Sequence, residues 1–504
     1  MRTYDLIVIG SGGASIVADA AIAAGKKVAI IEKTKFGGTC ATRGCIPTKV
    51  MVTAANAIRE IEDYQHIGIK TAPASIDWSL MSKRVWEVIN RHKGTQKYYE
   101  DAPNTDAFWG TATFVDNHTI NMIPNDGSES IHMTAPTIII GVGGHSKVAP
   151  TPGLEEAGYL TSENLFGQDY PDKPYKSLIV IGGGPIGTEF AHVFSAAGTE
   201  VTLVQRNVRL LPKEDEAVSQ AIYDNMKDHM NIFLNTVIES VQVEKGEKVV
   251  TVRNRDTNQV TQLRAQEILI ATGIQPAIEE LGLEHTDIDQ LPGGWIKTNE
   301  FLETSVDGIY ALGDVNGGAQ FRHKANYEAD IIAHNLYRAH SIDDMRWARY
   351  DVTPAVTYTY PEVGHVGLTE KEAQEQGYKV KTGINHYSTM AKGFAMGLIP
   401  GETNDGFVKI VVDADTNTIL GMHVIGPQAS ILFQPFVNLM NAGPTRIIPI
   451  HEEIASERAK KARAKGIVRP MDPHSVITVG ETMTPHPSLS EVIMWTQYYF
   501  EKRW

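Results

Sequence analysis

The chain has 504 residues, 42% hydrophobic and 21% charged, so it can build ordinary packed cores in about three or four domains. Its formal net charge of −14 argues against nucleic acid or an anionic membrane surface as the main partner, because both require a basic surface. No apolar run is long enough to span a bilayer, and no cleavable targeting segment is recognisable at the N-terminus. These features predict a soluble, cytoplasmic protein.

The first 150 residues open with a strand–turn–helix–strand pattern. The apolar run LIVIG at 6–10 is followed by a glycine turn, an alanine-rich helix and a second apolar run, VAIIE at 28–32. Short apolar runs joined by a helix are typical of a βαβ unit. The pattern returns in SLIVIGGG at 177–184 and VTLVQR at 201–206. This recurrence indicates a duplicated nucleotide-binding unit.

Two further blocks complete the chain. Residues 276–350 contain a strand, DGIYALGD, and a helix, FRHKANYEADIIAHNLYRA. Residues 351–504 contain the strands AVTYTY, FVKIVVDA and TILGMHVIG and then helices, which predicts an α+β domain. The expected fold class is therefore α/β, with two Rossmann-like units, at 1–150 and 151–275, and a C-terminal α+β domain.

The first glycine loop follows a strand and opens a helix. Glycines let backbone N–H groups approach a pyrophosphate closely, and the helix N-terminus adds partial positive charge. Ser15 replaces the third glycine of the usual fingerprint, and an acid ends the second strand, where it suits a ribose diol. We predict a dinucleotide site formed by Gly10, Gly12, Gly13, Ala14, Glu32 and Lys33.

The second glycine loop has all three glycines of the fingerprint, Gly182, Gly184 and Gly187. Two such units predict two dinucleotides, as is needed to pass hydride from a nicotinamide to a flavin. The acid that selects NADH is replaced at the strand end by Gln205, which Arg206 and Arg209 follow. Arginines suit a 2′-phosphate, so we expect NADPH over NADH; solvated surface arginines are the alternative.

The only two cysteines, Cys40 and Cys45, lie five residues apart. Two thiols without a His-x-x-x-His partner do not complete a zinc site, so no metal is expected. An isolated close pair in a large cytosolic chain is more often catalytic, although two buried inert cysteines are the alternative. Cys45 begins an amphipathic helical run, and a thiol at a helix N-terminus has a lowered pKa.

The segment around the cysteines reads GGTCATRGCIPTK, from Gly37 to Lys49. Later motifs follow in order: GGGPIGTEF, ATGIQP, TSVDGIYALGD, PAVTYTYPEVGHVGLTE, ILGMHVIGPQAS and HPSLSE. Together they resemble the class I pyridine nucleotide-disulfide oxidoreductases, such as dihydrolipoamide dehydrogenase, glutathione reductase, mercuric reductase and mycothione reductase. The resemblance implies an FAD domain at 1–150, an NAD(P)H domain at 151–275, a return segment of the FAD domain at 276–350 and a dimerisation domain at 351–504.

The resemblance also implies roles for single residues. Cys45 would be the thiol nearest the flavin, and Cys40 the interchange thiol that attacks a substrate disulfide. Lys49 and Glu189 would form an ion pair beside the flavin and the nicotinamide, and Asp314 would contact the flavin's ribityl chain. The remaining implied cofactor contacts are Gly38, Thr39, Gly143 and Gly273.

Thiol–disulfide exchange needs an acid–base group beside the interchange thiol. The family uses the His of an HPTxSE-like motif, oriented by a Glu five residues later, and supplies both from the partner subunit. Here His486 and Glu491 match, with Ser488 in place of the Thr. The resemblance therefore implies a homodimer with shared active sites.

The sequence motifs identify the disulfide chemistry more closely than they identify the substrate. The absence of further cysteines makes mercuric reductase and large thioredoxin reductase activities unexpected. The stretch beginning IDWSLMSKRV and the later GPQASILFQP look most like mycothione reductase-type proteins, which favours reduction of a low-molecular-weight disulfide. An NAD-linked dihydrolipoamide dehydrogenase is the alternative, since HPSLSE is close to the ending of those enzymes. A dimeric flavoprotein without turnover is a more distant alternative.

Residues 444–482 are an insertion relative to the family. Within it, HEEIASERAKKARAKG has acids first, bases last and a closing Gly466, which predicts a helix. Its basic side chains form either a solvated surface or an anion-attracting lip at the partner's Cys40 site. These bases are Arg458, Lys460, Lys461, Arg463 and Lys465.

Overall fold

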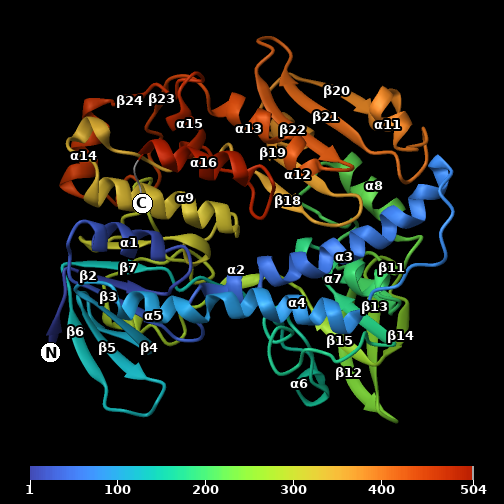
Figure 1. The fold of residues 1–504 in the computed structure, drawn as a ribbon, viewed down its shortest axis with the longest axis horizontal. Helices are drawn as coiled ribbons and strands as arrows, with labels where there is room; N and C mark the ends of the chain where they lie inside the picture. Colours follow the sequence, from blue (N-terminus) through green and yellow to red (C-terminus); the bar gives the residue numbers. More distant parts are fainter. Residues whose placement is uncertain (502–504) are drawn as a thin grey trace.

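The computed structural model of the chain describes residues 1–501 (Figure 1). It confirms the expected α/β class, with two parallel-sheet units and a C-terminal α+β unit. The last three residues of the predicted C-terminal domain lie outside the described residues. Within the described part, every helix is too short or too polar to cross a membrane.

The first unit is built on an eight-stranded sheet in the order β1-β6-β5-β4-β3-β2-β7-β17. Strands β3, β2, β7 and β17 pair in parallel, and β4, β5 and β6 form an antiparallel extension. The strand from the return segment thus completes the sheet of the N-terminal unit. The strands are β1 Arg2–Thr3, β2 Leu6–Ile9, β3 Val28–Glu32, β4 Thr105–Asp116, β5 Thr119–Pro124, β6 Ile131–Thr134, β7 Thr137–Ile140 and β17 Ile309–Ala311.

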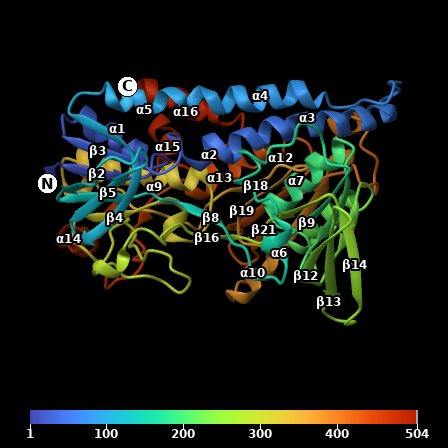
Figure 2. The ribbon, with the colours of Figure 1, turned by 90° about the horizontal axis from the view of Figure 1, so that it is seen from below.

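Helices cover this sheet and extend beyond it. Helices α1 and α9 pack against each other over the sheet, and α3 and α4 run across to the second unit (Figures 1 and 2). There α3 packs against α7, so apolar side chains of both units share one core. These helices are α1 Ser15–Ala23, α2 Gly38–Arg43, α3 Cys45–Asp63, α4 Trp78–Asn90, α5 Thr95–Glu100, α7 Pro185–Ala196 and α9 Arg322–Tyr337.

The second unit has a four-stranded parallel sheet, β11-β10-β9-β15, beside a three-stranded antiparallel sheet, β12-β13-β14. The two-stranded pair of β8 and β16 joins it to the first unit. Its elements are α6 Leu154–Ala157, β9 Ser177–Ile181, β10 Glu200–Val204, α8 Glu216–Met226, β11 Asn231–Phe233, β12 Thr236–Glu244, β13 Glu247–Asn254, β14 Val260–Ala265 and β15 Glu267–Ile270, with β8 Gly144–Ser146 and β16 Ile274–Pro276.

The C-terminal unit is a five-stranded antiparallel sheet, β18-β19-β22-β21-β20, followed by helices. A short strand pair, β23 with β24, closes the base of the predicted insertion. The elements are β18 Ala355–Thr357, β19 Val363–Gly367, α10 Glu370–Glu375, β20 Val380–His386, α11 Ala391–Ala395, β21 Phe407–Asp413, β22 Ile419–Ile425, α12 Ala429–Leu432, α13 Gln434–Asn441, β23 Thr445–Arg446, α14 Glu457–Lys465, β24 Val468–Arg469, α15 Val476–Glu481 and α16 Glu491–Glu501.

Candidate active site

The two cysteines meet at the junction of α2 and α3. Cys40 lies on α2 and is buried, and Cys45 is the first residue of α3. Gly44 separates the helices, where a Cβ atom would lie 2.9 Å from the carbonyl oxygen of Thr39. Only glycine fits this turn without displacing the backbone. Both cysteines are free thiols in this structure, so it represents the reduced pair.

The two thiols have opposite acidities. A hydrogen bond with Cys40 lowers the pKa of Cys45 to about 6, and the positive charge of Lys49 adds to the effect. The same bond, together with burial, raises the pKa of Cys40 well above its ordinary value. At neutral pH the pair therefore holds one thiolate, on Cys45, and one thiol, on Cys40. This agrees with the lowered pKa expected at the start of a helix.

A histidine and a glutamate complete a relay to Cys40. The Nε2 atom of His486 lies 3.2 Å from the Sγ atom of Cys40, and its Nδ1 atom lies 2.9 Å from Oε1 of Glu491. Donation from Nδ1 to the carboxylate leaves a lone pair on Nε2, facing the thiol. The backbone N–H of Ser488 donates to Oε2 of Glu491 at 3.1 Å and holds the carboxylate in place. The arrangement suits proton transfer to and from Cys40.

The described chain places His486 and Glu491 differently from the partner-supplied pair that the resemblance implies. His486 contacts Cys40 of its own chain, and Glu491 contacts His486. The backbone N–H of His486 also donates to Nδ1 of His323, on α9 of the first unit, at 3.3 Å. The loop bearing the acid–base histidine is thus fixed to the FAD-type unit of the same chain.

The insertion explains how the loop arrives there. Between β23 and β24 the chain crosses to the first unit, where α14 lies beside α9 and apart from strands β20–β22 (Figure 1). Arg463 on α14 makes two bonds of 2.7 Å to the fully buried carboxylate of Glu300, and Ser456 bonds to Glu303 at 2.7 Å. Apolar side chains of α14 pack against Trp347 and its neighbours.

The predicted helix of the insertion forms, and several of its bases bind residues of the same chain. It begins at Glu457, capped by Ser456, and ends before Gly466 in a left-handed conformation. Its bases bind the same chain: Arg463 bonds to Glu300, Arg458 donates to the carbonyl of Asn335, and Lys465 pairs with Asp343. These bonds anchor one side of the helix, whereas Lys460, Lys461 and Lys465 are exposed, so part of the basic cluster is solvated surface.

A cavity of about 680 Å³ runs from the first glycine loop to the cysteines. Gly10, at φ +99°, sits so tightly that a Cβ atom would lie 2.3 Å from the carbonyl oxygen of Gly141. Ala14, predicted as a contact, lies behind the loop, since its methyl group faces Gly141. The predicted cofactor residues that line the cavity are Gly10, Gly12, Gly13, Glu32, Lys33, Gly38, Thr39, Gly143 and Asp314, together with Cys40 and Cys45.

The lining fits a flavin dinucleotide. Gly38 approaches Gly12 so closely that a Cβ atom would lie 2.6 Å from its Cα, which leaves backbone N–H groups as the cradle for a pyrophosphate. Glu32 at the end of β3 lines the cavity, accepts from the Ser11 hydroxyl at 2.7 Å, and stands where an acid suits a ribose diol. Burial raises the pKa of Asp314, deep in the cavity, to about 6, and it offers an acceptor to a polyol chain.

The second glycine loop repeats this construction. A Cβ atom on Gly187 would lie 1.8 Å from the carbonyl oxygen of Gly182, so only glycine fits at this position in the first turn of α7. Gln205 is buried and its Oε1 atom accepts from the backbone N–H of Gly183 at 3.3 Å, as Glu32 does in the first loop. Gly184 is open on its outer side.

The predicted cofactor-selecting residues lie beyond Gln205. Arg206 is exposed, and Arg209 forms an ion pair with Glu216 at the start of α8. Gly273 follows β15 at φ +123° and accepts a hydrogen bond from the backbone of Lys147 at 2.8 Å. The two arginines therefore follow Gln205 on the surface side of β10, and one of them is already paired with a carboxylate.

The expected ion pair links the two units. The Nζ atom of Lys49, on α3, lies 2.7 Å from Oε2 of Glu189, on α7. Sequence reasoning missed Tyr358, whose backbone N–H donates to Glu189 at 2.9 Å and whose ring lies 4.6 Å from the Lys49 ammonium. It also missed Arg322, which lines the cavity and whose charge acts on both thiols. Tyr358 lies within the motif PAVTYTYPEVGHVGLTE and Arg322 lies in none of the motifs, but in neither case does the sequence indicate these contacts.

Comparison with known proteins agrees with this geometry. Residues 4–329 match the family model described as pyridine nucleotide-disulphide oxidoreductase, and residues 353–455 match its dimerisation domain. Among curated relatives, a mercuric reductase of Staphylococcus aureus is 34% identical over 84% of this chain and 75% of its own. A dihydrolipoyl dehydrogenase of Bacillus subtilis is 30% identical over 97% and 96%, and a mycothione reductase of Mycobacterium tuberculosis 31% over 88% and 94%.

A solved structure shows the same fold over nearly the whole chain. The HOCl-induced flavoprotein disulfide reductase RclA from Escherichia coli superposes with a TM-score of 0.74 at 25% identity, covering 97% of this chain and 98% of its own. Members of this family depend on FAD and use NAD(P)H, and the matching dimerisation domain supports a homodimer. The chain belongs to the pyridine nucleotide-disulphide oxidoreductases and is a flavoprotein disulfide oxidoreductase.

Proposed function

We propose that the protein reduces a low-molecular-weight disulfide with NADPH, through FAD and the Cys40–Cys45 pair. The observation that carries the proposal is the relay of Glu491, His486 and Cys40, with a second, low-pKa thiol at Cys45. Acid–base assistance at a buried thiol is what exchange with a small disulfide needs. A flavoprotein without turnover would not require this relay.

The residues support the following sequence of bond changes. His486 takes the proton of Cys40, whose sulfur attacks one sulfur of the substrate; the first thiol leaves with the proton held by His486. The Cys45 thiolate then attacks the Cys40 sulfur, which forms the Cys40–Cys45 disulfide and releases the second thiolate, which takes a proton from solvent. Bound FAD would supply the electron pair, taken as hydride from NADPH, that reduces this disulfide again. Overall, NADPH, a proton and one disulfide give NADP⁺ and two thiols.

Other residues would position the two cofactors. FAD would lie along the cavity, held by the first glycine loop, Glu32 and Asp314. Lys49, paired with Glu189, would place a positive charge between the flavin and the second nucleotide unit. Their pairing across α3 and α7 would also fix the angle between the two units.

We assign NADPH from the residues after β10. Arg206 is exposed beside the second loop, and a 2′-phosphate could replace Glu216 as the partner of Arg209. Gln205 is neutral and already bonds to the glycine loop, so no carboxylate there repels the phosphate.

A dihydrolipoamide dehydrogenase is the second candidate. The B. subtilis relative of that name aligns with 97% of this chain, a larger share than the mercuric and mycothione reductases. In that case the same thiols and His486 would catalyse the reverse reaction, the oxidation of dihydrolipoamide, with NAD⁺ as the hydride acceptor. We further propose a cytoplasmic homodimer in which each active site is complete within one chain.

Purified FAD-loaded enzyme should be assayed with lipoamide, glutathione disulfide, coenzyme A disulfide, bis-glutamylcystine and a mycothiol-type disulfide, each with NADPH and NADH. We expect the enzyme, with NADPH, to reduce one of the four disulfides other than lipoamide far faster than it reduces lipoamide. Cys40→Ser is the matched control and should abolish every activity. Preferential oxidation of dihydrolipoamide with NAD⁺, or reduction of lipoamide with NADH, would establish the second candidate, and no disulfide turnover at all would refute both.

A further inference from the structure

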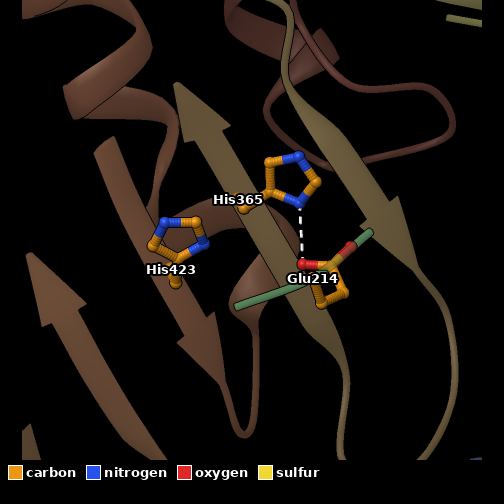
Figure 3. Close-up of side chains that lie close together, drawn as sticks. All are labelled: Glu214, His365 and His423. Atoms are coloured by element: carbon orange, nitrogen blue, oxygen red, sulfur yellow. Dashed lines mark hydrogen bonds and ion pairs between the residues drawn. The ribbon is translucent and has the colours of Figure 1, made fainter. Parts of the chain in front are cut away.

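Two histidines and a glutamate meet far from the cysteines, where the second unit touches the C-terminal sheet. His365 on β19 and His423 on β22 are direct cross-strand neighbours, so they share one face of the sheet. Glu214, from the segment between β10 and α8, reaches this face, and its Oε2 atom lies 2.7 Å from Nδ1 of His365 (Figure 3). One potential ligand atom from each residue lies within 4.8 Å of the other two.

The hydrogen bonds of His423 leave one ring nitrogen without a partner. Its Nε2 atom donates to the carbonyl oxygen of Leu368 at 3.0 Å, which places the ring proton on Nε2. The Nδ1 atom therefore carries a lone pair, yet it is buried and has no hydrogen-bond partner, and the residue is 0% exposed. In Figure 3 a ring nitrogen of His423 points toward Glu214 and His365. A backbone carbonyl that fixes the tautomer of an imidazole is typical of metal-binding histidines.

The charged side chains next to this group pair with one another and not with Glu214, His365 or His423. Lys409 on β21 is the next cross-strand neighbour of His423, and its ammonium group is held by Asp215 at 2.9 Å and Glu370 at 2.7 Å. Asp215 is further occupied by capping α8, where it accepts from the backbone N–H of Ala217. Glu214 is thus the carboxylate directed at the two imidazoles.

We propose that Glu214, His365 and His423 bind a divalent transition-metal ion, with Zn²⁺ as the representative. Two imidazoles and one carboxylate form a ligand set that Zn²⁺ accepts, whereas Mg²⁺ and Ca²⁺ prefer oxygen atoms alone. Metal–ligand bonds of about 2.1 Å place ligand atoms at most about 4.2 Å apart, so the group must contract by roughly half an ångström. The ion replaces the proton between His365 and Glu214 and binds the free lone pair of His423.

Such an ion would connect two units of the fold. Glu214 belongs to the NAD(P)H-type unit, and both histidines belong to the C-terminal sheet. The backbone N–H of Glu214 bonds to the carbonyl of Leu211, and Leu211 bonds in turn to the carbonyl of Gly183 in the second glycine loop, at 2.9 and 2.8 Å. The bound ion would therefore hold the segment that runs from this loop to α8. The sequence gives no sign of the site, because its ligands come from three separated segments.

Zn²⁺ binding should be measured on FAD-loaded, full-length protein carrying Cys40→Ser and Cys45→Ser, so that the active-site thiols cannot bind the ion. After chelator treatment and removal of the chelator, we expect one Zn²⁺ per chain and no saturable binding of Mg²⁺. Glu214→Gln, His365→Gln and His423→Gln should each weaken Zn²⁺ binding at least about a hundredfold, since losing even an outer-shell partner costs about 10–100-fold. His386→Gln, which removes a histidine paired with Asp405 on the same sheet, should bind like the parent.

Folding of each variant is checked by its FAD content and its thermal unfolding without metal. Zn²⁺ should raise the Tm of the parent by mass action and leave that of Glu214→Gln unchanged. Glu214→Gln preserves the shape of the side chain. If either histidine variant loses FAD, the Zn²⁺ affinity of Glu214→Gln alone tests the proposal. Failure of the parent to bind one equivalent, or unchanged affinity in Glu214→Gln, would overturn the proposal.

Discussion

The Nε2 atom of His486 lies 3.2 Å from the Sγ atom of Cys40 in the same chain. The imidazole is oriented from behind by Glu491, at 2.9 Å from its Nδ1 atom. Both residues follow the insertion at 444–482. The insertion packs on the first unit, and the segment after it brings His486 to Cys40. One chain therefore contains the thiols, the proton acceptor and the residue that orients it.

The relay predicts a selective kinetic defect. His486→Ala should leave reduction of bound FAD by NAD(P)H intact but slow disulfide turnover about a hundredfold or more, because acid–base assistance at Cys40 is lost. Stopped-flow and steady-state rates separate the two half-reactions. His474→Ala, an exposed histidine earlier in the same segment, is the matched control and should behave as wild type. An unchanged steady-state rate in His486→Ala would show that another group transfers the proton.

The same-chain arrangement predicts the result of mixing two inactive variants. Chains with Cys40→Ser and chains with His486→Ala, co-expressed with different tags and purified as mixed dimers, should stay as slow as His486→Ala alone. Each chain then lacks one member of its own relay, and the partner cannot supply it. Recovery of activity in the mixed dimer would show that His486 acts on the partner's Cys40.

The insertion should be anchored by its buried ion pair. Arg463→Ala leaves the carboxylate of Glu300 buried without its partner, which should lower the free energy of unfolding by about 3–5 kcal/mol. Lys460→Ala, on the exposed side of the same helix, should leave chemical denaturation curves unchanged. Equal curves for Arg463→Ala and wild type would mean that α14 does not rest on Glu300.

Cofactor selection should depend on the two arginines after Gln205. Replacing Arg206 and Arg209 by Ala should lower the ratio of kcat/KM for NADPH to that for NADH by about tenfold or more, because each charged hydrogen bond to a phosphate is worth about 1.5–3 kcal/mol. Arg264→Ala, on β14 of the same unit, should leave the ratio unchanged. A wild-type enzyme that prefers NADH would move the assignment to dihydrolipoamide dehydrogenase.

Local motifs account for most of what the sequence could predict. The glycine loops and the helix that begins at Cys45 are marked in the sequence by residues only a few positions apart, and they lie where predicted. The methyl group of Ala14 faces Gly141, which the fingerprint could not predict, since it does not tell which side of the loop a methyl group faces. The contact of His486 with Cys40 of the same chain could not be predicted. It depends on the path of the insertion, which is held by ion pairs between residues far apart in the sequence. The group of Glu214 and two histidines depends in the same way on how the sheets meet.

The central claim is that electrons pass through Cys40 and Cys45 beside FAD. The absorbance spectrum of the two-electron-reduced enzyme, which reports the Cys45 thiolate, tests this claim most directly. Anaerobic addition of two electrons per chain should produce a long-wavelength absorbance band from this thiolate against the flavin. The pKa of Cys45 is lowered to about 6, so the band should be full above that pH and fade as pH falls through about 6. Cys40→Ser should show the band without reductant, and Cys45→Ser should lack it. A band that survives in Cys45→Ser, or purified protein without FAD, would contradict the account.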